Sequence, residues 1–331
     1  MRPLRLGHGQ GLLLLGGGRS ARKQERGGED VAHASSNPRG KGGAPFVERC
    51  GTAYTRRPRG RSKRLACWRI PDAMETEDDA PRHLRLAGII RLGLGGGRGP
   101  RDAYVFDPHR LALPAWACAL GDTEGPALLV TLDRHLDTVM PRAPAAVPDR
   151  TAGLRALDEH ARWALDVRNY DHILAAMEAG LVGDALLIAR ARPRGAFTGD
   201  TYVDSRGRPH RLVAVPTVDR AAEAYSRPAP GDAVRDVLDA AGRVLLDVDL
   251  DCFTSLSDAD PTTVLPWPRQ VIREFLLPED SEPFWDAVLR KTVALTLARE
   301  PHHCGGLLAS GDLFQDAAQV LFRELLRTEP P

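Results

Sequence analysis

Residues 127–137 read ALLVTLDRHLD, an apolar run followed by three polar side chains at alternate positions. Six residues that are apolar except for one Thr are typical of a buried strand. Because alternate side chains of an extended chain share a face, Asp133, His135 and Asp137 are predicted to lie together where this strand ends. Two carboxylates and an imidazole suit Mn²⁺, Fe²⁺ or Zn²⁺. A polar loop after a buried strand is the alternative.

A second stretch of this kind is RVLLDVDLD at 243–251, which places Asp247, Asp249 and Asp251 on one face. Three buried carboxylates repel one another, so either their pKa values rise or cations neutralise them. The apolar residues 244–246 and 252–253 on either side argue against a solvated strand edge. Metal binding is therefore the better interpretation of this strand.

The rest of the chain from about residue 85 alternates short apolar runs with helical periodicity. The expected strands are 102–106, 127–132, 184–190, 211–215, 243–250 and 292–298, and the expected helices are roughly 110–120, 152–166, 171–180, 268–289 and 312–328. Such alternation predicts an α/β fold, a three-layer αβα sandwich with a mainly parallel central sheet. Ligands bind such sheets beyond the carboxyl ends of the strands. The Gly-rich residues 93–99 lack the spacing of a nucleotide-binding motif and are predicted to form a turn or loop.

Charge is distributed unevenly along the 331 residues. Residues 1–73 hold 16 Lys/Arg against 5 Asp/Glu, and the remainder holds 29 against 39. An acidic body argues against nucleic acid as a partner and suits cations, whether metal ions or an arginine-like substrate. The five Cys form no C-x-x-C pair and the longest apolar run near the N-terminus is Leu12–Leu15, so we expect a cytoplasmic protein without a membrane partner.

Residues 1–80 are predicted to be a disordered basic tail, ahead of a single domain at 85–331. The tail is rich in Gly, Arg, Ser and Pro. A nucleic-acid or membrane arm and a solvated tail are two interpretations. The favoured one is upstream sequence included by a wrong start, with Met74 as the natural start, because composition changes there.

A third element is Asp107-Pro108-His109, which follows the strand DAYVF and precedes a helix. At this point the chain resembles the arginase/agmatinase ureohydrolase superfamily. The resemblance lies in the six metal ligands of that superfamily. They are matched in order by His109, Asp133, His135, Asp137, Asp247 and Asp249. Further segments resemble the peptide arginases, which convert arginine residues of peptides to ornithine: DVDLDCF, HRLALPAWA, NYDHILAAMEAG and TLAREPHHCGG. The resemblance covers roughly residues 100–310.

The resemblance implies an arginase-like fold with two ions, Mn²⁺ in each case. One ion would take His109, Asp133, Asp137 and Asp247, and the other His135, Asp133, Asp247 and Asp249. It further implies that a metal-activated water attacks the guanidinium carbon of an arginine-containing peptide or another guanidino substrate, which yields urea and an amine.

Two catalytic residues are implied in the same way. Glu300 would grip the guanidinium and His172 would carry a proton to the departing amine, whereas Asp251 would support the ligands. A surface Glu before Pro301 and a partly buried helix His are the alternatives. The acidic strand continues as Leu-Asp-Cys-Phe instead of the Gly-Leu-Asp-Pro typical of free arginases and agmatinases, which favours a larger or different guanidino substrate.

Two other functions fit part of the pattern. Haloacid-dehalogenase-like phosphatases use D-x-D after a buried strand, then a Lys, then G-D-x-x-x-D, and this chain offers Asp247 and Asp249, Lys291, and 311–316. That class gives no role to His109 or to residues 133–137. A metal-stabilised protein without turnover is the second alternative. The oligomeric state is not readable from the sequence.

Overall fold

The computed structural model describes residues 88–95, 97–121, 125–229 and 232–328, all of them within a compact unit, Ala66–Pro331. The predicted tail at 1–80 and the predicted start at Met74 lie outside the described residues. Among the described residues, no helix is both long enough and apolar enough to span a membrane.

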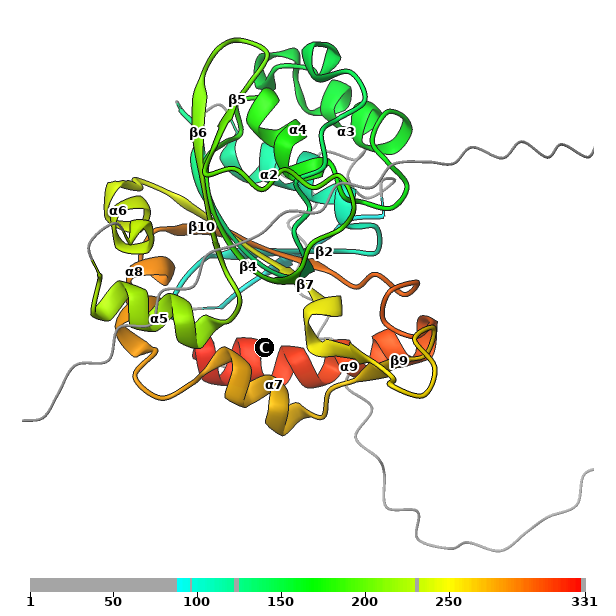
Figure 1. Ribbon diagram of the computed structural model, residues 1–331, viewed down its shortest axis with the longest axis vertical. Coiled ribbons are helices and arrows are strands. Elements are labelled where there is room, and N and C mark those ends of the chain that lie inside the picture. Colours follow the sequence, from blue (N-terminus) through cyan, green and yellow to red (C-terminus); the bar gives the residue numbers. More distant parts are fainter. Residues whose placement is uncertain (1–87, 96, 122–124, 230–231, 329–331) are drawn as a thin grey trace, which may run out of the picture. The chain divides into compact units, whose positions relative to one another are not determined.

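A sheet of eight strands forms the centre of this unit, in the order β1-β2-β10-β7-β3-β4-β6-β5 (Figure 1). Its six inner strands are parallel, and β1 and β5 pair antiparallel at the two edges. The bounds are β1 Ile90–Gly93, β2 Asp102–Phe106, β3 Ala127–His135, β4 Val182–Ala191, β5 Thr201–Val203, β6 Pro209–Val215, β7 Val244–Asp249 and β10 Thr292–Ala298. A small hairpin, β8 (Thr254–Leu256) and β9 (Val264–Pro266), follows β7.

Helices cover both faces of the sheet, so the predicted three-layer α/β fold is confirmed. One face is covered by α2 (Ala112–Leu120), α3 (Leu154–Trp163) and α4 (His172–Glu178). The other is covered by α5 (Val218–Ser226), α6 (Ala233–Ala240), α7 (Arg269–Leu276), α8 (Glu282–Leu289) and α9 (Leu307–Ala318), which continues as a π-helix, Gln319–Leu325. The two groups of helices separate clearly in Figure 1.

The fully buried strands were the easiest elements to predict. Every expected strand is present, within a few residues of its expected bounds. The helix expected over 268–289 is instead two helices, because Leu277 leaves the helical conformation before Pro278, which disfavours it. Helices α5 and α6 were not predicted, although Thr217 and Asp232 cap them by accepting hydrogen bonds from Arg220 N and Val234 N, each at 3.2 Å.

Strand pairing determines which polar residues meet. Strand β7 lies between β3 and β10, and both Thr131 and Thr296 are register partners of Asp247. The three strands are parallel, so their carboxyl ends lie at one edge of the sheet. Residues at or just beyond these ends, such as Asp133, Asp249 and Glu300, therefore come together at that edge.

Candidate metal centre

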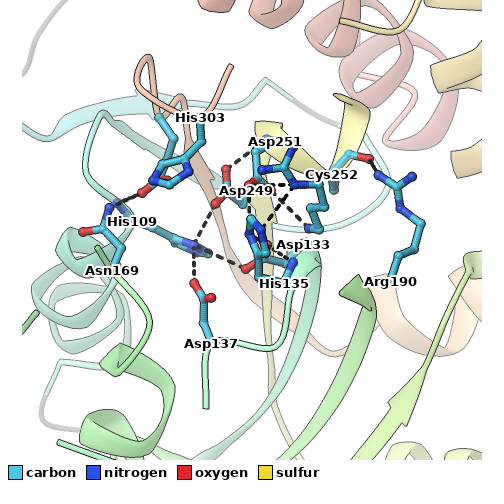
Figure 2. Close-up of polar contacts among 12 residues, drawn as sticks. His109, Asp133, His135, Asp137, Asn169, Arg190, Asp249, Asp251, Cys252 and His303 are labelled. Atoms are coloured by element: carbon cyan, nitrogen blue, oxygen red, sulfur yellow. Dashed lines mark hydrogen bonds and ion pairs between the residues drawn. The ribbon is translucent and has the colours of Figure 1, made fainter. Parts of the chain in front are cut away.

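The ring of His109 lies among the carboxylates at this edge (Figure 2). His109 belongs to a short 3-10 helix, His109–Leu111, that follows β2, and it is fully buried. Its Nδ1 lies 3.1 Å from Asp249 Oδ2, 3.4 Å from Asp137 Oδ2 and 3.7 Å from Asp133 Oδ2. One imidazole nitrogen thus faces three predicted ligands at once.

The other nitrogen of this ring is held by Asp247. His109 Nε2 lies 2.8 Å from Asp247 Oδ2, which also accepts a hydrogen bond from Thr131 Oγ1 at 2.8 Å. The second oxygen, Oδ1, accepts from Thr296 Oγ1 at 2.5 Å. Both oxygens of Asp247 therefore have protein partners from neighbouring strands, and the carboxylate orients His109 so that Nδ1 faces the remaining acids.

A second imidazole meets Asp251, which lies in the short 3-10 helix Leu250–Phe253 directly after β7. His135 Nδ1 lies 3.0 Å from Asp251 Oδ2 and 3.9 Å from Asp133 Oδ1. Asp251 Oδ1 accepts from Arg134 N at 3.1 Å, and Asp249 Oδ1 accepts from Asp251 N at 3.0 Å. These main-chain contacts fix the carboxylates before any ligand arrives. Asp251, which was expected only to support the ligands, itself contacts the predicted ligand His135.

The chemistry of the free donor atoms fits divalent metal ions. Within the described residues, seven buried side-chain nitrogen or oxygen atoms lack a hydrogen-bond partner, and five belong to this cluster: His109 Nδ1, Asp133 Oδ2, Asp137 Oδ1, His172 Nε2 and Asp251 Oδ2. An unpaired buried polar atom is costly, so such a concentration indicates a missing partner. Three residue groups have donor atoms within 4.8 Å of one another: His109/Asp133/Asp249, Asp133/His135/Asp251 and His109/Asp137/His172.

Electrostatics point the same way. Burial, together with the charges of Asp137, Asp251 and Asp249, raises the pKa of Asp133 well above its ordinary range. Burial and the charge of Asp251 raise the pKa of Asp249 to about 7. Although burial favours the neutral ring, the charges of Asp247 and Asp249 raise the pKa of His109. The cluster is acidic beyond what its histidines neutralise, and bound cations would relieve this repulsion.

The predicted substrate anchor, Glu300, reaches this centre from the end of β10. The residue is 5% exposed and its backbone has a φ of 36°, an uncommon conformation for a non-glycine residue. Its amide donates to Asp107 O at 3.1 Å, and its side-chain Oε1 accepts from His109 N at 2.8 Å. The turn thus directs the carboxylate back towards the cluster, unlike a surface Glu.

His172 and His303 differ in environment. His172 is fully buried, and burial followed by the charge of His109 lowers its pKa to about 4. Its Nδ1 lies 2.8 Å from Asn169 O, and its ring centroid is 4.1 Å from that of His109. His303 is partly exposed, with Nε2 3.6 Å from Glu300 Oε2 and a ring 6.2 Å from that of His135.

Sequence reasoning assigned no role to His303 or to Asn169. Both lie in segments that carried the resemblance, TLAREPHHCGG and NYDHILAAMEAG, and that was the available signal. Nothing in the local pattern distinguished these side chains from their polar neighbours.

The residues of the alternative phosphatase motif do not meet. Lys291 precedes β10, at the opposite end of the strands from Asp249, and its Nζ donates to Leu238 O at 2.6 Å and Asp239 O at 3.1 Å. Asp312 is exposed on α9. A phosphatase would need this Lys beside its paired aspartates, so the geometry argues against that class.

Comparisons with known proteins give a weak likeness. No family model and no curated protein matches this chain. Among solved structures, it is similar to proclavaminate amidino hydrolase from Streptomyces clavuligerus (16% identity, 67% of this chain and 62% of that one, TM-score 0.34). It is also similar to agmatine ureohydrolase of Thermoplasma volcanium (14%, 67% and 61%, TM-score 0.32) and arginase from Bacillus subtilis (15%, 69% and 72%, TM-score 0.35).

The chain spans about three fifths of the length of the first two of these structures. At TM-scores below 0.5 the likeness carries no argument about activity. The case for a function therefore depends on the residues of the centre.

Proposed function

We propose that this protein is a two-metal hydrolase that cleaves a guanidino group to urea and an amine. The observation that carries the proposal is the buried cluster of unpartnered carboxylate and imidazole atoms directly beside the carboxylate of Glu300. Cations in the cluster and a substrate cation at Glu300 would account for both sets of negative charge. Hard oxygen and imidazole donors suit Mn²⁺.

In the ligand set that the contacts favour, Asp249 and Asp251 take the places that were expected for Asp247 and Asp249. We assign one ion to His109, Asp133, Asp137 and Asp249, and the other to His135, Asp133, Asp249 and Asp251. Asp133 and Asp249 would be shared. Asp247 then orients His109 instead of serving as a ligand, which agrees with its three hydrogen-bond partners.

When bound, such a pair of ions would supply a water activated for attack and a Lewis acid for the developing charge. Glu300 would hold the guanidinium by a charge-assisted hydrogen bond, with its carbon facing the ligands. The reaction forms a C–O bond and breaks a C–N bond, and the departing amine takes up a proton. We assign the delivery of that proton to His303, because it lies beside Glu300 and has access to solvent, whereas His172 has neither property.

We infer that the substrate is an arginine residue within a peptide, which the reaction converts to ornithine. Two segments that form the site continue into exposed apolar side chains. Val167 is 77% exposed and lies two residues before Asn169, and Leu308 is 85% exposed at the start of α9 after His303. A substrate larger than a free amino acid would find apolar contacts there.

The test is urea release from an arginine-containing peptide by the Mn²⁺-loaded protein. His135→Ala should abolish release, and Lys291→Ala should leave it nearly intact, because Lys291 lies at the far end of the strands. A phosphatase would show the opposite pattern, with phosphate release lost in Lys291→Ala. Bound Mn²⁺ without urea from any guanidino compound would instead identify a metal-stabilised protein without turnover.

A further inference from the structure

Asn169 lies at the junction of three site elements. It is 6% exposed, in the loop between α3 and α4, and has a φ of 64°. Asparagine is among the few residues that adopt this left-handed conformation readily. In this conformation its side chain contacts Arg110 and Glu300, and its main-chain carbonyl contacts His172.

The orientation of the Asn169 amide is fixed by its partners. Its Oδ1 accepts hydrogen bonds from Arg110 N at 3.4 Å and Arg110 Nη1 at 3.1 Å. Because Arg110 offers only donors there, the oxygen must face Arg110 and the NH₂ group must face Glu300. Nδ2 accordingly donates to Glu300 Oε1. The main-chain carbonyl meets His172 Nδ1.

Glu300 thereby has two unlike oxygens. Oε1 accepts from both His109 N and Asn169 Nδ2, whereas among the described residues the only ionic or hydrogen-bond partner of Oε2 is His303 Nε2, at 3.6 Å. In the view of Figure 2, Asn169 and His303 lie on the same side of the cluster, opposite Arg190. A carboxylate held through one oxygen can present the other in a single direction.

We propose that Asn169 is a positioning residue: it fixes Oε1 of Glu300 so that Oε2 receives the substrate guanidinium. The inference rests on the proposed function, since it names how that site binds its cation. Removal of the amide leaves Glu300 with one anchor, and its carboxylate then loses the orientation that binding requires. The effect should fall on KM more than on kcat.

The experiment measures urea release from Nα-acetyl-arginine amide by Mn²⁺-loaded protein, in wild type and in Asn169→Gly. Glycine keeps the left-handed backbone and removes only the side chain. We expect KM to rise about tenfold, with kcat within about threefold. Asn169→Asp should raise KM further, because a second carboxylate then faces Oε1. The matched control is Asp280→Gly, an exposed residue with a φ of 61°, which should change neither constant.

Two outcomes separate this inference from the proposed function. An active wild type with an unchanged KM in Asn169→Gly would overturn the positioning role and leave the hydrolase intact. Equal losses in Asn169→Gly and Asp280→Gly would do the same, because they would show a general cost of glycine. A wild type that releases no urea from any arginine compound would overturn the proposed function itself. Unchanged Mn²⁺ content in Asn169→Gly excludes loss of metal as the cause.

Discussion

Two buried acidic clusters in this molecule differ in how their charges are balanced. In the first, Glu178 accepts hydrogen bonds from Tyr202 Oη at 2.5 Å and Ser205 Oγ at 2.5 Å. Asp204 accepts from Arg208 Nε at 2.6 Å and Arg208 N at 2.8 Å. Both carboxylates there meet donors from the β5–β6 hairpin.

In the candidate metal centre, by contrast, one oxygen each of Asp133, Asp137 and Asp251 has no hydrogen-bond partner among the described residues. Asp204 and Asp251 are both buried, with 4% and 1% of their surface exposed, so burial does not distinguish the two clusters. The difference is the number of donors that the protein supplies. A buried acid with a complete set of donors stabilises the fold, and one without them indicates a ligand that comes from outside.

The largest expected effect separates the two clusters by function. Asp249→Ala removes the carboxylate that we assign to both ions, so Mn²⁺ content should fall and urea release should drop on the order of 10³-fold or more. Glu178→Gln should change neither. Metal analysis and urea assays on both variants test this, and retention of two Mn²⁺ per chain by Asp249→Ala would refute the ligand assignment.

A second pair of variants tests the ligand assignment along β7 and the 3-10 helix that follows it. Asp251→Asn removes a proposed ligand, and we expect urea release to fall about 100-fold or more with loss of one Mn²⁺. Asp247→Asn removes only the group that orients His109, and should weaken metal affinity about 10- to 100-fold while both ions still bind at saturating Mn²⁺. Titration of each variant with Mn²⁺ distinguishes them. Loss of an ion at saturation in Asp247→Asn would restore the ligand set expected from the sequence.

The pH dependence of stability should have opposite signs in the two clusters. The pKa of Asp249 is raised to about 7, so the metal-free folded protein binds an extra proton, and its stability falls as pH rises from about 4 to about 7. Although burial opposes ionisation of Asp204, hydrogen bonds from Arg208 and His210 lower its pKa to about 2. Its contribution is present above about pH 4 and is lost as pH falls towards 2.

Thermal unfolding with EDTA and with Mn²⁺, across this pH range, measures both effects. Saturating Mn²⁺ should remove the loss of stability between pH 4 and 7, and should add about 2.7 kcal/mol at a hundred times Kd. Asp204→Asn should remove only the acid-side loss. A metal-free protein that becomes more stable from pH 4 to 7 would contradict the account of the metal centre.

The smallest effect is expected on stability, from variants of the cluster that contains Glu178 and Asp204. Glu178→Gln turns one acceptor oxygen into a donor that faces the Ser205 N–H or the Tyr202 hydroxyl, so we expect about 1–3 kcal/mol loss in the free energy of unfolding. Tyr202→Phe should cost about 1 kcal/mol. Urea denaturation measures both, and an activity loss beyond twofold in either variant would link this cluster to the site.

The sequence predicted the sheet and the location of the centre because buried strands are apolar along their whole length and end in polar residues. It could not decide which acids of 247–251 find hydrogen-bond donors within the protein, because residues at alternate positions share a face. The choice depends on where β7 ends against β3 and on the threonines at the level of Asp247. Asn169 and His303 come from loops whose paths depend on tertiary contacts.

The pairing of β3 with β7 has a consequence for how this protein could change over evolution. The distance between Asp133 and Asp249 is set by the main-chain hydrogen bonds between β3 and β7. Side-chain substitutions leave these bonds in place. By contrast, the exposed side chains of Val167 and Leu308 lie on a loop and at the start of a helix, where substitutions are tolerated more readily. If the proposed activity holds, replacement of these exposed segments would change the substrate while the residues at the sheet edge stay in place.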